Sequence, residues 1–293
     1  MNQSGWFLLG APWDCSGTGR GEQAAPAALR RAGLSTLVAH DLGDAAAVID
    51  SRRRDPDTGI LALPETVRAA EALGEALAAG LRDHPGRRPL VVGGDCSILL
   101  GIVPALRHRS DRVGLWFVDG HPDYIDALAS STGETADLDL AALTGDGPAP
   151  LVALAGAAPA VPAELAVLIG HRTRDLDPDS AAELARVPAA LRSLDADAVR
   201  RDPAGAGERA AKWLAAHPAW LHVDLDVLDP KAQPAVTYPQ PGGPDWDDLT
   251  ALLRPLARSP RLLGASVADF RPDLDPTGAL AARIVALLRD VLP

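Results

Sequence analysis

The feature that most constrains the fold is the regular alternation of short apolar runs with amphipathic stretches along the 293 residues. Apolar runs bounded by turn residues are typical of buried strands, and apolar residues repeated every three or four positions are typical of helices. Strands that alternate with helices build βαβ units, in which the sheet is mainly parallel and covered on both faces. The sequence therefore predicts α/β architecture, as a single three-layer domain over residues 1–293 with a mainly parallel sheet of about eight strands flanked by helices.

The expected strands are Trp6–Leu9, Thr36–His40, Pro89–Val92, Val113–Val118, Leu165–Ile169, Ala190–Leu194, Ala219–Val223 and Leu262–Val267. The expected helices are Pro26–Ala32, Glu65–Arg82, Ser97–Arg107, Pro178–Arg186, Asp195–Ala216, Trp246–Arg258 and Pro276–Leu292. The stretch Gly145–Pro162 is rich in Ala, Pro and Gly, and we expect it to be a flexible insertion rather than a domain boundary.

The composition narrows the class of protein. A formal charge of −11 argues against nucleic acid as a partner. The chain has two cysteines and no CxxC motif, which excludes a disulfide scaffold and fits a reducing compartment, so we expect a cytoplasmic location. Neither a signal-peptide pattern nor an apolar run of about 18 residues is visible, so no contact with a membrane is expected.

Two clusters of ligand-capable side chains directly follow two of the apolar runs. They are Asp119, His121 and Asp123 after the fourth run, and Asp224 and Asp226 after the seventh. Alternate residues of an extended chain share a face, and ligands of parallel sheets bind outside the carboxyl ends of the strands. Carboxylates gathered there repel one another unless a cation lies between them. The two clusters therefore predict a metal centre, and more than one ion.

A third motif, Val91-Val-Gly-Gly-Asp-Cys-Ser97, combines a buried strand, a Gly-Gly turn and the start of a helix. Taken alone, it is explained by Asp95 or Ser97 capping the first amides of that helix. Its position places Cys96 at the same edge of the sheet as the two clusters. Cys96 is therefore either a metal ligand, since a thiolate binds metals, or a buried and inert cysteine.

The order of these motifs resembles that of the ureohydrolase superfamily, which comprises arginases, agmatinases and formiminoglutamases. The residues that carry the resemblance are GGDCS, DGHPD, and DLDVLDP followed by Tyr238-Pro-Gln-Pro-Gly-Gly243. The opening Gly10-Ala-Pro12 and the closing Ala265–Pro272 are also similar, so the resemblance spans nearly the whole chain. It implies the fold predicted above and hydrolysis of a guanidino or formimino C–N bond, usually with two Mn²⁺.

The resemblance also implies the metal ligands: Cys96, Asp119, His121, Asp123, Asp224 and Asp226. The family normally has histidine where this chain has Cys96, so another divalent metal is an option. The resemblance implies that two ions about 3.5–4 Å apart would hold a hydroxide, which would attack the guanidinium-type carbon of a small-molecule substrate. Asp123 thereby takes part in catalysis, whereas we expect Asp229 to have a structural role in a turn.

A second departure from the family concerns proton transfer. Arginases carry a histidine proton shuttle where this chain has Ala136, and general acid–base help is worth about 10²- to 10⁴-fold. His222, Glu134 and Asp137 are candidate replacements, although a packing role for His222 is an alternative. The two departures together resemble the cysteine-containing Nω-hydroxy-L-arginine amidinohydrolase type, which implies a modified arginine as substrate.

The resemblance implies several substrate-binding residues. Thr132 matches a hydroxyl that contacts the substrate carboxylate, and Arg271 is a further candidate for that group. Asp175 and Asp177 resemble acids that meet an α-amino group, with a role at a helix start as the alternative. Asp269 stands where the family places a glutamate against the guanidinium, and it is one methylene shorter.

Two other functions compete with this amidinohydrolase. A catalytically inactive member of the family could bind metal in a sensory or structural role after losing its proton shuttle. A deacetylase-like zinc hydrolase is more distant, because the pair of histidines that it needs is not seen in the sequence. The resemblance leaves the assembly open: arginases are often trimers and agmatinases hexamers, so a homo-oligomer is expected.

Overall fold

The computed structural model describes residues 5–107, 110, 112–156 and 159–292. Its strands are β1 (Trp6–Ala11), β2 (His40–Asp44), β3 (Arg88–Gly93), β4 (Gly114–Val118), β5 (Ala166–Ile169), β6 (Arg192–Leu194), β7 (Ala219–Asp224) and β8 (Leu262–Ala268). They form one sheet in the order β2-β1-β3-β8-β7-β4-β5-β6, and every pairing between these strands is parallel. The predicted α/β fold with an eight-stranded parallel sheet is confirmed.

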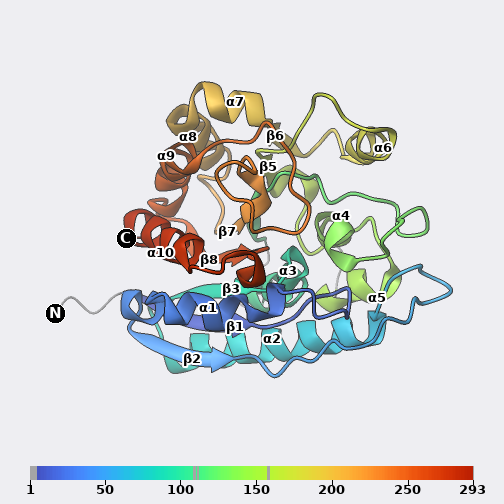
Figure 1. The fold of residues 1–293 in the computed structure, drawn as a ribbon, viewed down its shortest axis with the longest axis horizontal. Coiled ribbons are helices and arrows are strands. Elements are labelled where there is room, and N and C mark those ends of the chain that lie inside the picture. Colours follow the sequence, from blue (N-terminus) through green and yellow to red (C-terminus); the bar gives the residue numbers. More distant parts are fainter. Residues whose placement is uncertain (1–4, 108–109, 111, 157–158, 293) are drawn as a thin grey trace.

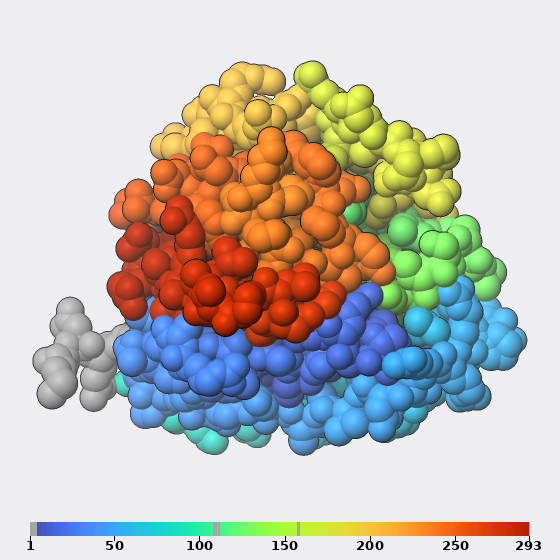
Figure 2. Space-filling view, viewed as in Figure 1, coloured from blue at the N-terminus to red at the C-terminus, as the bar shows by residue number. Residues whose placement is uncertain are grey.

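The helices are α1 (Ala25–Arg31), α2 (Leu63–Asp83), α3 (Leu99–Arg107), α4 (Asp139–Thr144), α5 (Ala149–Val152), α6 (Pro178–Arg186), α7 (Ala196–Arg201), α8 (Pro203–Trp213), α9 (Trp246–Ala257) and α10 (Ala279–Val291). Two series of helices flank the sheet (Figure 1): α3 contacts both α2 and α4, and α1, α10, α9 and α8 form the second series. In Figure 2 the C-terminal segment (red) lies directly against the N-terminal segment (blue).

The helix expected over Asp195–Ala216 is divided into α7 and α8. Pro203 is the first residue of α8, and Asp202 caps it by accepting a hydrogen bond from the Gly205 amide. A proline disfavours helical backbone in the residue before it and lacks the amide that a continuous helix needs, so the break lies at this dipeptide. The short helices α4 and α5 were not predicted, and α5 lies within the stretch expected to be a flexible insertion, of which residues 157–158 lie outside the described residues.

The second strand was also misplaced. The predicted strand Thr36–His40 overlaps a 3₁₀ turn, Leu34–Leu37, and β2 begins only at His40. β2 is exposed along its length and pairs with β1 alone. An edge strand with one neighbour needs no apolar run and is often polar, which is why hydrophobicity did not locate it.

The strand order determines where the chemistry can occur. β3, β8, β7 and β4 are neighbours in the middle of the sheet, and all point the same way. Their carboxyl ends therefore meet at one edge, where GGDCS, DGHPD, DLDVLDP and Asp269 follow. Among the described residues, no helix is long and apolar enough to cross a membrane.

Candidate active site

Cys96 is positioned by a tight turn after β3. Asp95 caps the following 3₁₀ turn by accepting a hydrogen bond from the Ser97 amide at 3.0 Å, and it also accepts one from the Cys15 amide at 2.6 Å. Asp95 is therefore the helix cap that the simpler interpretation predicted. These bonds fix the backbone on both sides of Cys96, whose buried thiol points toward the acidic cluster.

The turn also requires glycine at position 94. A Cβ there would overlap the carbonyl oxygen of Trp13. We expect Gly94→Ala to lower the free energy of unfolding by about 3 kcal/mol, because backbone atoms in a packed core cannot move aside cheaply. Urea unfolding measures the loss, with Gly5→Ala as control, since a Cβ at Gly5 meets nothing within 4 Å. Equal stability of the two variants would contradict the close approach.

The ends of β4 and β7 are joined by hydrogen bonds to Asp226. Its Oδ2 atom lies 2.7 Å from His121 Nδ1, and its Oδ1 accepts a hydrogen bond from the Gly120 amide at 3.0 Å. The His121 amide donates to Asp119 Oδ1 at 2.7 Å, while Asp119 Oδ2 is buried without a hydrogen-bond partner. These contacts leave carboxylate oxygens free to meet a cation.

The predicted ligands form one linked cluster. Each of several triads has its ligand atoms within 4.8 Å of one another: Cys96 with Asp119 and Asp224, Asp119 with His121 and Asp226, Asp224 with Asp226 and Asp269, and Cys96 with Asp123 and Asp139. All six predicted ligands are thus brought together, and Asp269 and Asp139 join them. Asp123 and Asp269 adopt left-handed backbone, with φ of 50° and 55°, a conformation that aspartate tolerates better than most residues and that is concentrated at functional sites.

The electrostatics of the cluster favour a bound cation. Burial, together with repulsion between neighbouring carboxylates, raises the pKa values of Asp119, Asp123 and Asp224 well above their usual range. Burial opposes ionisation of Asp226 as well, but the neighbouring His121 outweighs it and lowers the pKa of Asp226. Carboxylate oxygens, one imidazole and one thiol, with a buried oxygen of Asp119 still unpartnered, suit two divalent ions such as Mn²⁺.

A cavity of about 440 Å³ opens onto this cluster. Besides the six predicted ligands it is lined by Thr132, Glu134, Ala136, Asp137, Asp177, Glu183 and Asp269, among others. Both oxygens of Asp269 lie within hydrogen-bond distance of the Thr237 amide, at 3.0 and 3.1 Å. Burial raises the pKa of Asp269 to about 7. The cavity therefore places a carboxyl group beside the cluster of ligands, where a polar or cationic substrate group can meet it.

Comparison with known proteins identifies the family. The model of the Arginase family matches residues 4–292. The chain belongs to the Arginase family. The arginase of Bacillus caldovelox is 30% identical over 291 residues, which cover 96% of this chain and 95% of that protein. The native structure of that arginase at pH 5.6 matches with a TM-score of 0.87 and 28% identity over 98% of this chain and 97% of the other. The formimidoylglutamase of Bacillus subtilis, at 18% identity and a TM-score of 0.71, shares the fold and covers 99% and 87% of the two chains.

Two of the substrate-binding residues predicted for this Arginase-family chain, Thr132 and Asp269, line the cavity. Thr132 donates a hydrogen bond to Asp137. Asp177 also reaches the cavity, but it is the N-cap of α6 and accepts hydrogen bonds from the Asp179 and Ser180 amides, so the alternative role at a helix start is confirmed.

Three predicted residues lie away from this cavity. Asp175 lines an adjacent hollow instead. Arg271 is held by Asp273 through hydrogen bonds of 2.9 and 2.7 Å. His222 is buried in β7, where its Nδ1 lies 2.8 Å from Ser266 Oγ and its ring stacks on Phe117. Burial lowers the pKa of His222 to about 3. Its placement corrects the assignment as a catalytic group and favours the packing role.

The sequence interpretation missed several cavity residues of this family member. Arg20 donates two hydrogen bonds to Glu134, at 2.8 and 2.7 Å, and so joins the loop after β1 to the loop after β4. Glu22 is fully buried beside Arg20 and accepts a hydrogen bond from Thr237. Glu183 of α6 accepts one from the Tyr124 amide, and burial raises its pKa to about 7. None of these residues stands in a motif, and their distance in sequence from the ligands hid them.

Proposed function

We propose that this protein is a dinuclear-metal amidinohydrolase that cleaves a C–N bond of a small guanidino substrate. The observation that supports it is the linked cluster of six ligand residues beside a cavity that also contains Asp269. When two Mn²⁺ are bound, they supply an activated water nucleophile and stabilise the charge that develops on the reacting carbon centre. Relatives named arginase, matched over nearly the whole chain, support the same reaction class.

Asp269 orients the reacting group of the substrate. It lies within the same triad as Asp224 and Asp226, so a guanidino nitrogen that contacts Asp269 brings its carbon next to the metal positions. The Thr237 amide fixes the carboxyl group. Burial raises the pKa of Asp269 to about 7 without metal, and neighbouring cations favour its ionised form.

Asp137 is the best placed of the three candidate proton carriers. Glu134 is engaged by Arg20 and by the hydroxyl of Tyr238, and His222 does not reach the cavity. Asp137 lines the cavity one residue after Ala136, and burial raises its pKa to about 6. General acid–base groups work best when their pKa lies near the operating pH. We therefore assign proton transfer to Asp137.

The substrate that we propose is a modified arginine such as Nω-hydroxy-L-arginine. We expect the Mn²⁺-loaded protein to hydrolyse it with a kcat/KM at least about a hundredfold above that for L-arginine, because the hydroxyguanidine group is less basic and reaches a site without the shuttle histidine as a neutral group. Ornithine release from both substrates, measured side by side, tests this. Equal rates would overturn the substrate assignment while leaving the hydrolase assignment intact.

The absence of histidine at position 136 also favours a second candidate, a metal-binding member of the family without turnover. Metal binding with no hydrolysis of any guanidino compound in a substrate panel would support it. We further propose a cytoplasmic location, supported by two cysteines that are both free and buried. A homo-oligomer, as the resemblance to arginases and agmatinases implies, is proposed as well and is tested by light scattering.

A further inference from the structure

Asp139 is a buried carboxylate that no motif indicates. It is the first residue of α4 and has no exposed surface. Both of its carboxylate oxygens are buried without a hydrogen-bond partner among the described residues. Burying an ionised carboxylate without a partner destabilises the folded state by several kcal/mol. A partner of opposite charge offsets a free-energy cost of about that size. The position of Asp139 is therefore explained only by a proton or by a cation.

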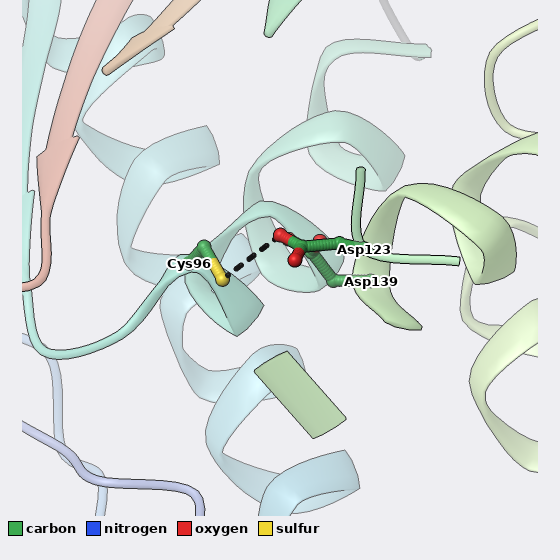
Figure 3. Close-up of side chains that lie close together, drawn as sticks. All are labelled: Cys96, Asp123 and Asp139. Carbon is green, nitrogen blue, oxygen red and sulfur yellow. Dashed lines mark hydrogen bonds between the residues drawn. The ribbon is translucent and has the colours of Figure 1, made fainter. Parts of the chain in front are cut away.

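The surroundings of Asp139 favour a cation. Figure 3 shows the side chains of Asp123 and Asp139 lying side by side and directed toward the thiol of Cys96. One ligand atom from each of the three residues lies within 4.8 Å of the others, and Cys96 Sγ is 3.5 Å from Asp123 Oδ2. Three elements supply them: the turn after β3, the loop after β4 and the start of α4. A thiol and two carboxylates that converge in this way can meet around one ion.

The triad of Cys96, Asp123 and Asp139 lies at one end of the cluster, and His121 lies at the other. His121 and Asp226 form a triad with Asp119, and neither belongs to the triad of Asp139. Cys96 also groups with Asp119 and Asp224, so it connects the Asp139 triad to the carboxylates between the two ends. The cluster therefore offers two positions, one near His121 and one near Cys96.

We propose that Asp139 is a metal ligand, which completes with Cys96 and Asp123 a thiolate–carboxylate position of the centre. The proposal rests on the dinuclear function proposed above and adds a residue to it. A cysteine side chain is shorter than histidine, so an ion bound to Cys96 lies closer to the turn after β3. Asp139 supplies the extra oxygen donor there. Its charge adds to that of the thiolate, which strengthens binding of a divalent ion at this position and gives it mixed soft and hard ligands.

Metal titration of the metal-free protein tests the role of Asp139. Calorimetry with Mn²⁺ and Co²⁺ is expected to show two ions for the unmodified protein, and an Asp139→Asn variant is expected to bind one of them at least about tenfold more weakly. With Co²⁺, the thiolate-to-metal charge-transfer absorption reports the ion at Cys96. That absorption is expected to require more Co²⁺ in Asp139→Asn, which identifies the weakened position.

Asp137→Asn is the matched control. Asp137 is two residues away and lines the same cavity, but it accepts hydrogen bonds from Thr132 and Ser130 and belongs to none of the triads. Its substitution is expected to leave both metal affinities unchanged. Unchanged affinity and absorption in Asp139→Asn would overturn the proposal. If Asp139→Asn does not fold, Asp139→Glu is titrated instead. A ligand carboxylate displaced by one methylene must alter the cobalt absorption, so an unchanged absorption in Asp139→Glu would overturn the proposal.

The same titration separates this proposal from the function on which it rests. An unmodified protein that binds no ion would overturn the dinuclear hydrolase. Two ions that bind equally well to the unmodified protein and to Asp139→Asn would leave the hydrolase in place and remove only Asp139 from its ligands.

Discussion

Exchanging Asp226 for asparagine is expected to reduce turnover of a guanidino substrate by at least about a hundredfold. Substitution of a residue that only orients a metal ligand already lowers metal affinity or activity by about 10- to 100-fold. Asp226 does more, because it belongs to two triads of ligand atoms, pairs with His121 Nδ1 at 2.7 Å and accepts the Gly120 amide. Its loss removes a ligand charge and releases the histidine that shares the metal position.

Asp229→Asn is the control for this experiment. Asp229 belongs to the same DLDVLDP segment, but it accepts hydrogen bonds from the Lys231 and Gly242 amides, at 3.0 and 2.8 Å, as expected for a turn. Kinetics and metal content of both variants are compared, with circular dichroism to confirm folding. Loss of turnover in Asp226→Asn with normal metal and fold in Asp229→Asn supports catalysis at the cluster. Full activity of Asp226→Asn would exclude this cluster as the catalytic centre.

Removing the metals is expected to reverse the pH dependence of stability. In the metal-free protein the raised pKa values of Asp119, Asp123 and Asp224 keep protons on the folded state that the unfolded chain loses above about pH 4. The folded state then binds more protons, so its stability falls as the pH rises. His121, whose pKa is raised by Asp226 against the effect of burial, acts in the same direction. His171 and His222 have lowered pKa values and oppose the trend only below about pH 6.5.

Acidification stabilises the metal-free protein wherever these carboxyl groups are protonated in the folded state and ionised in the unfolded chain. We therefore expect the chelated protein to gain stability as the pH is lowered toward about 6.5. The Mn²⁺-saturated protein is expected to lose stability instead, because protons compete with the metal for the carboxylates. Thermal unfolding with and without chelator measures both slopes.

Asp224→Asn is the internal check on this reversal. The variant removes one titrating carboxyl group and is expected to flatten the slope of the metal-free protein. Parallel slopes for the chelated and the Mn²⁺-saturated protein would show that the cluster does not bind the added metal. That result would contradict the metal centre independently of any activity measurement.

The sheet was predictable from sequence because most of its strands are buried on both faces. β3, β4, β7 and β8 are mainly apolar and end at or next to glycine or aspartate, so composition alone marks them. β2 was missed by several residues because it lies at an exposed edge, where no apolar run is required. The break between α7 and α8 carried a visible signal, Asp202-Pro203, which the helical pattern on either side concealed.

The predicted metal ligands could be proposed from sequence because they stand in short motifs at strand ends, and the fold brings these residues together. Asp139 and Glu22 could not be found in the same way, since neither directly follows a predicted strand and each gains significance only because the fold buries it. His222 shows the opposite error. It lies two residues before Asp224 on the same strand, yet it is directed into the core, where Ser266 and Phe117 surround it. Spacing along a strand determines the face of a side chain but not its depth.

The place of β8 in the sheet bears on how the protein would obtain the proposed metals. β8 is the last strand in the sequence, yet it lies between β3 and β7 and joins the two halves of the sheet (Figure 1). During synthesis, all six predicted ligands leave the ribosome before β8, the strand that joins the two halves of the sheet. Pairing between strands so distant in sequence is slow. We therefore expect nascent chains to carry no stable metal centre, so that the metal supply available after synthesis decides which ions the protein acquires.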